Sequence, residues 1–92
     1  MTEPSQQDFE LLRAAIRAYV VQRRPAAFAV PGIQNALTNR AMVDFPITAE
    51  QVARECDLLE GLGHLTHHTN ELGSTKFYSA TAAGILAHER AR

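Results

Sequence analysis

Hydrophobic positions in the first quarter of the chain repeat with helical spacing. An apolar stripe at i, i+3 and i+4 predicts a helix that starts after Ser5 and ends at Arg23-Arg24-Pro25. The stripe consists of Phe9, Leu12, Ile16, Tyr19 and Val20. Four more apolar residues lie on an adjoining arc of the same helix: Leu11, Ala14, Ala18 and Val21. So wide an apolar face is either enclosed within the domain or paired with another subunit. We favour a homodimer through this arc, because a chain of 92 residues has little interior to spare.

Two more helices are predicted in the middle of the chain. Pro31-Gly32 opens the first, and its inner face is supplied by Ile33, Ala36, Leu37 and Ala41. Residues 42–47 contain Pro46 and form a connection. Thr48-Ala49-Glu50-Gln51 has the form of a capping box, which predicts a helix from Thr48 to about Leu62 that stops at Gly63. Three residues of this helix should face the core: Val52, Cys56 and Leu59.

The last third of the chain predicts a β-hairpin followed by a short helix. Residues 64–69 and 75–80 form the arms, with Gly73 in the turn between them. The hairpin is anchored by Leu65, Phe77 and Tyr78, and Thr81 caps a final helix in which Ala82, Ile85 and Leu86 pack inward. Residues 1–6 and 90–92 are expected to fray. The whole chain, 1–92, is therefore predicted to be one α+β domain, mainly α with a small β-hairpin.

Composition narrows the functional classes. Nine basic and ten acidic residues give a net charge of −1, so nucleic-acid binding has to depend on local patches. The chain contains no run of about 18 apolar residues, so no membrane span is predicted. The N-terminus lacks the features of a signal peptide. The single cysteine, Cys56, excludes an internal disulfide and fits a reducing cytoplasm.

Two short motifs resemble those of a known superfamily. The first is Leu59-Glu60-Gly61-Leu62-Gly63-His64-Leu65, which resembles the motif "Leu-x-x-x-Gly-Leu-hydrophobic". The second is Tyr78-Ser79-Ala80-Thr81-Ala82-Ala83-Gly84, which resembles the motif "Tyr-x-x-Thr-x-x-Gly". Both motifs are those of bacterial PadR, ArsR and MarR regulators. The chain is also similar in size and layout to small winged-helix proteins of Mu-like prophages. The resemblance implies a winged helix-turn-helix with a three-helix core, a hairpin wing and a C-terminal helix. His64 departs from the pattern, because leucine is usual after this glycine.

The resemblance also implies a DNA-binding transcriptional regulator whose recognition helix is residues 48–62. Thr48 would cap this helix, Gln51 and Arg54 would face bases, and Arg40, Lys76 and Asn70 would contact the DNA backbone. The charge of the helix opposes this function. The helix has a local net charge of −3, and DNA phosphates repel carboxylates. Its one basic residue is Arg54, and its acidic residues are Glu50, Glu55, Asp57 and Glu60. Arg54 is equally well placed to pair with Glu50 and Asp57 along the helix.

The alternative is a winged-helix protein-interaction module, of phage or prophage origin, that does not bind DNA. It is motivated by the net charge of −1 and by the acidic helix, which suits a basic partner. The candidate metal ligands lack the spacing of a metal site, so neither a metal nor a cofactor is expected. These candidates are His64, His67, His68, His88 and Cys56. The sequence contains no nucleophile elbow and no phosphate-binding glycine loop, so we do not expect an enzyme.

Overall fold

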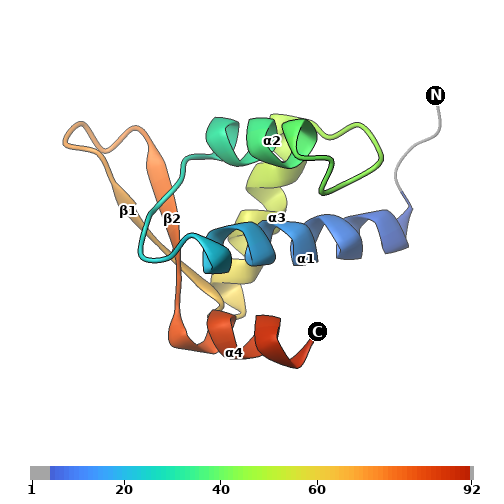
Figure 1. Cartoon of the computed structure of the whole chain (residues 1–92). Coiled ribbons are helices and arrows are strands. Elements are labelled where there is room, and N and C mark those ends of the chain that lie inside the picture. Colours follow the sequence, from blue (N-terminus) through green and yellow to red (C-terminus); the bar gives the residue numbers. More distant parts are fainter. Residues whose placement is uncertain (1–4, 92) are drawn as a thin grey trace.

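The computed structural model describes residues 5–91, which form four helices and a two-stranded sheet. The elements, in chain order, are α1 (Gln6–Gln22), α2 (Val30–Asn39), α3 (Ala49–Gly61), β1 (Leu65–Thr69), β2 (Lys76–Ala80) and α4 (Ala82–Arg90). Figure 1 shows α1 running through the middle, with α2 and α4 on either side of it and the hairpin at one end. The described residues confirm the mainly helical α+β layout.

α1 is the central helix, which explains its wide apolar surface. It packs against α2, α3, α4 and β2, and Leu12, Ile16 and Val20 are fully buried. Val21 is only 2% exposed within the single chain, in a hollow that α4 helps to form. Its assignment to a subunit interface is therefore wrong. The other residues of the predicted dimer surface remain at least partly accessible: Leu11, Ala14 and Ala18. Dimerisation through these three stays a prediction.

Both ends of the described region lie at capped helix termini. The Ser5 hydroxyl accepts a hydrogen bond from the Asp8 amide, and the Asp8 carboxylate accepts one from the Ser5 amide. This capping box fixes the start of α1 at Gln6, and α4 continues to Arg90, with Ala91 as its C-cap. Fraying of these helix ends stays a prediction, and its remaining positions, 1–4 and 92, lie outside the described residues.

α2 and α3 begin and end close to the predicted positions. α2 buries Ile33 and Leu37, but Ala41 lies beyond its end, exposed and at φ +53°, so Ala41 does not belong to the inner face. Thr48 and the third helical residue, Gln51, cap each other at the start of α3 as predicted. Gly63, at φ +81°, then turns the chain out of the helix in a conformation that favours glycine.

The hairpin is tied to the body of the domain through Tyr78. β1 and β2 pair antiparallel, with Leu65 opposite Ala80 and His67 opposite Tyr78. The backbone of Phe28 exchanges two hydrogen bonds with that of Tyr78, at 2.9 and 2.8 Å, so the segment before α2 lies along β2. Leu65 and Tyr78 are the buried anchors of the hairpin.

α4 packs through its only glycine. The Thr81 hydroxyl accepts a hydrogen bond from the Gly84 amide at 3.0 Å, and a Cβ at position 84 would overlap the carbonyl oxygen of His64. Ala82 and Leu86 are exposed, contrary to the prediction that they pack inward. Each lies two residues from Gly84, on the other side of the helix from the contact with His64.

Candidate functional site

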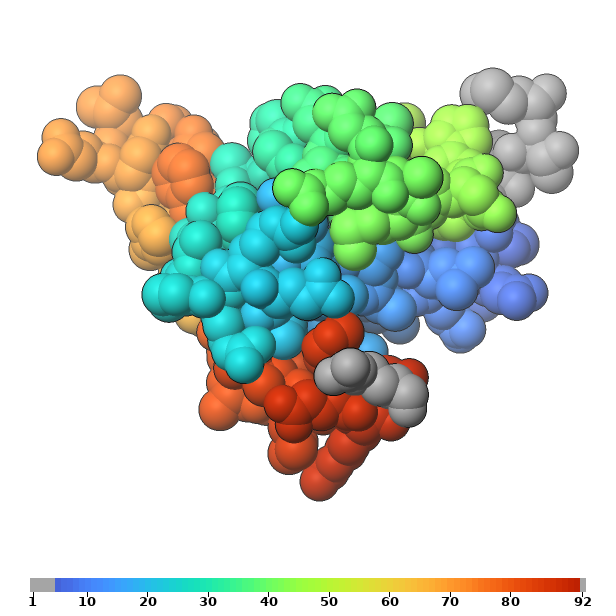
Figure 2. All heavy atoms as spheres, viewed as in Figure 1, coloured from blue at the N-terminus to red at the C-terminus, as the bar shows by residue number. Residues whose placement is uncertain are grey.

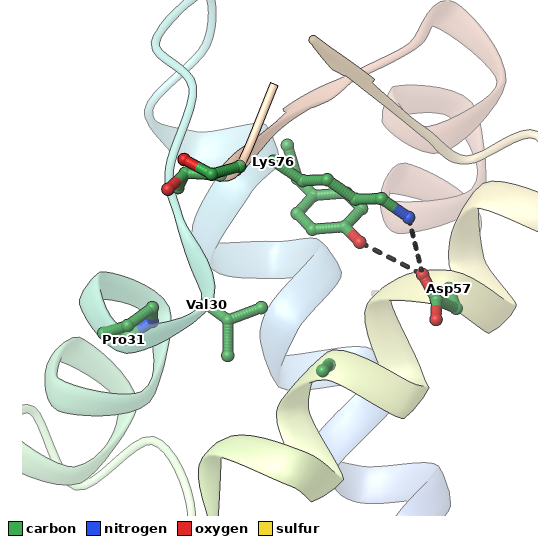
Figure 3. Close-up of a pocket in the computed structure, with 8 residues that line it drawn as sticks. Val30, Pro31, Asp57 and Lys76 are labelled. Carbon is green, nitrogen blue, oxygen red and sulfur yellow. Dashed lines mark hydrogen bonds and ion pairs between the residues drawn. The ribbon is translucent and has the colours of Figure 1, made fainter. Parts of the chain in front are cut away.

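A groove of about 360 Å³ lies between the start of α2, the middle of α3 and the second arm of the hairpin (Figure 3). One wall is apolar, and the other carries hydroxyl, carboxylate and amine groups. The lining residues are Val30, Pro31, Ala53, Asp57, Ser74, Thr75, Lys76 and Tyr78.

Asp57 is the charged centre of the groove. Its Oδ1 accepts a hydrogen bond from the Tyr78 hydroxyl at 3.1 Å, and the Lys76 Nζ lies 3.8 Å from the same oxygen (Figure 3). Burial raises the pKa of Tyr78, and the bond to Asp57 raises it further, so the phenol stays a donor. The Asp57 side chain is 62% exposed. Its carboxylate is therefore held through Oδ1 by two residues that line the groove with it, while much of the side chain stays open to solvent.

Two other acids of α3 point away from the groove. Glu55 is buried and accepts a hydrogen bond from the Arg13 Nε at 2.8 Å, which joins α3 to α1. Glu60 pairs with His67 of β1. These contacts give the acidity of α3 a structural reason. Both residues contribute to the net charge of −3 over residues 48–62, but one is buried against Arg13 and the other is held by a histidine.

The outer side of α3 is partly apolar. Leu58 and Leu62, one helical turn apart, are 43% and 56% exposed. Arg54 lies one turn before Leu58 and forms an exposed pair with Glu50, 3.9 Å between Nη2 and Oε1. The local pairing of Arg54 with Glu50 is thus present, while Asp57 turns to Tyr78 and Lys76 instead.

The residues predicted to contact DNA have structural partners. The Gln51 Oε1 accepts a hydrogen bond from the Thr48 amide at 2.9 Å, and the Thr48 Oγ1 accepts one from the Gln51 amide at 3.1 Å. The Asn70 Oδ1 accepts hydrogen bonds from the amides of Ser74 and Thr75, at 2.8 and 3.1 Å, which shape the hairpin turn.

Arg40 and Lys76, the two predicted phosphate ligands, do not lie together. The Arg40 guanidinium is 5.9 Å from the centroid of the Tyr19 ring, beside α1. Lys76 lies in the groove next to Asp57. Lys76 therefore lies beside α3, whereas Arg40 lies beside α1, away from Lys76.

His64 and Cys56 have environments that explain their residue types. The Arg17 Nη1 lies 3.3 Å from the His64 Nδ1, and burial together with this guanidinium lowers the pKa of the imidazole. Burial raises the pKa of the Cys56 thiol to about 12, so the thiol is not ionised at neutral pH. Among residues 5–91, no three histidine, cysteine or acidic side chains cluster as metal ligands would.

Comparison with known proteins gives no assignment for this arrangement. No protein-family model matches the chain, and no curated protein matches it. In the part of the chain that the structure describes, no helix has the length and apolar character needed to cross a membrane.

Proposed function

We propose that this chain is a winged helix-turn-helix domain that serves as a protein-interaction module, and that its groove receives a basic segment of the partner. α2 and α3 correspond to the helix-turn-helix, the hairpin to the wing, and α4 to the closing helix. The observation that carries the proposal is the Asp57 carboxylate, which lines the groove, is 62% exposed and is positioned by the Tyr78 hydroxyl at 3.1 Å.

The charge around the groove favours a cationic ligand over DNA. Within α3 and the hairpin, the non-histidine cations are Arg54 and Lys76, and each already lies beside a carboxylate. The exposed acids of the same elements outnumber them: Glu50, Asp57 and Glu71. Binding to a duplex rests on neutralising phosphates with lysine and arginine, and this surface offers two such cations.

The apolar part of α3 also fits a protein partner better than a base pair. Leu58 and Leu62 add two half-exposed leucines to the outer side of α3, and leucine side chains offer no hydrogen bond to base edges. A basic amphipathic segment would place a cation on Asp57, in exchange for Lys76, and apolar side chains on the leucines. Exposed ion pairs such as Lys76–Asp57 contribute about 0–1 kcal/mol, so replacing Lys76 by a cation of the partner costs little free energy.

Fluorescence anisotropy with a labelled twelve-residue peptide of alternating arginine–leucine pairs tests the proposal. We expect binding to the native protein and about tenfold weaker binding to Asp57→Asn, because a charge-assisted contact is lost. The asparagine oxygen can still accept the Tyr78 hydroxyl, so the fold is kept. Asp44→Asn makes the same charge change at an exposed loop position and should leave the affinity unchanged. Equal affinities for the native protein and Asp57→Asn would refute the proposal.

A further inference from the structure

Two guanidinium groups converge on one aromatic ring on another side of the domain. Arg23, the C-cap of α1, has its guanidinium carbon 4.2 Å from the centroid of the Tyr19 ring. Arg40, the C-cap of α2, is 5.9 Å from the same centroid. Phe28 packs against Tyr19 with ring centroids 4.9 Å apart. Arginines from two helix ends thus both contact the Tyr19 ring, against which Phe28 packs.

Arg23 and Arg40 form what we call the arginine cluster. The neighbouring Arg24 lies apart from them, in a hollow with Val21, His88 and Glu89. Within residues 5–91, neither arginine of the cluster has a carboxylate at ion-pair distance, although other cations of the chain do: Arg13, Arg54 and Lys76. Arg23 donates one bond to the Tyr19 carbonyl oxygen in the last turn of α1, at 3.4 Å, which orients its side chain and leaves most of its N–H groups for a ligand.

The arginine cluster and the Asp57 groove are on different sides of α1. α1 meets α3 through Arg13, and Tyr19 lies six residues later, about 120° around the helix. Figure 2 shows α1, α2 and α4 forming one face of the molecule, with most of α3 hidden behind them. The domain therefore presents the Asp57 groove and, separately, a basic surface at the ends of α1 and α2.

We propose that the arginine cluster is a docking surface for a short acidic segment of a partner protein. Guanidinium groups bind carboxylates through two parallel N–H···O bonds, and stacking on Tyr19 holds the two groups ready for this. Tyr19 is only 7% exposed, so its ring offers no platform on which nucleic-acid bases could stack. Two arginines also match a few carboxylates better than the phosphate rows of a duplex.

A labelled octaglutamate peptide tests this surface independently of the groove. We expect salt-sensitive binding that falls at least about tenfold in the double variant Arg23→Gln/Arg40→Gln. Arg54→Gln/Arg90→Gln changes the net charge equally and should retain the affinity within about twofold. Arg23→Lys/Arg40→Lys keeps the charge but loses the planar fork, so an intermediate affinity is expected.

Three outcomes would overturn the proposal. The first is no binding of octaglutamate to the native protein. The second is an equal loss in the two glutamine variants, which would make the effect one of net charge. The third is that Arg23→Gln/Arg40→Gln abolishes the binding of a duplex, which would make this a nucleic-acid surface. Circular dichroism of each variant, together with the lysine variant, separates loss of binding from loss of fold.

Discussion

The Arg13 Nε donates a hydrogen bond to the buried Glu55 carboxylate at 2.8 Å and so joins the central helix to α3. The two side chains are 26% and 6% exposed. Of the pairs made by the acids of α3, this is the one most shielded from water. Since a carboxylate in this position needs a partner, the contact fixes how α3 lies against α1.

Arg13→Met should lower the free energy of unfolding by about 2–3 kcal/mol, because it leaves the Glu55 carboxylate buried without its donor. Arg54→Met, which removes only the exposed pair with Glu50, should cost less than about 1 kcal/mol. Urea denaturation of both variants measures the difference. The double variant Arg13→Met/Glu55→Met should recover most of the loss. Equal destabilisation by Arg13→Met and Arg54→Met would show that the Arg13–Glu55 pair stabilises the fold no more than the exposed Arg54–Glu50 pair.

Gly84→Ala should destabilise the protein by about 2 kcal/mol or more, because the new methyl group meets the backbone of His64 and forces α4 away. Gly61→Ala is the matched control. It lies at the end of α3 with nothing within 4 Å of the added carbon, so it should be neutral or stabilising by up to about 1 kcal/mol. Thermal or urea unfolding compares the two, and a Gly84→Ala protein as stable as Gly61→Ala would contradict the close approach.

Acid should weaken the junction at His64. The imidazole has an ordinary pKa of 6.5, and burial and Arg17 lower that pKa in the folded protein. Between the two pKa values the unfolded chain holds more protons, so the free energy of unfolding falls as the pH drops below about 6.5. His64→Gln, which can still accept a bond from Arg17, should lack this part of the pH dependence.

Urea denaturation at pH 7.5 and at pH 5 measures that dependence. The exposed His68→Gln serves as the control and should keep the pH response of the native protein. An unchanged response in His64→Gln would show that His64 does not govern the pH dependence of stability.

Features set by neighbouring residues were predictable from the sequence. The Thr48–Gln51 capping box, the glycine turn at Gly63 and the hairpin each depend on a few consecutive residues. Thr81 caps α4 as predicted, and Gly84 of the same motif is explained by its close contact with the backbone of His64.

Contacts between distant segments were not predictable in the same way. Arg13 and Glu55 are 42 residues apart, and Tyr78 and Asp57 are 21 residues apart. One signal was present for Glu55, which continues the inward spacing of Val52, Cys56 and Leu59. For Asp57 the signal was weaker: a buried tyrosine needs a hydrogen-bond partner, but periodicity does not say which residue supplies it.

An NMR titration of the ¹⁵N-labelled protein tests the proposed groove most directly. The arginine–leucine peptide and a mixed-sequence DNA duplex are added to separate samples at the same concentration and salt. We expect the peptide to shift the amide signals of Ala53, Asp57 and Lys76, and the duplex to leave them in place. Shifts of these signals by the duplex, with none caused by the peptide, would contradict a protein-interaction groove.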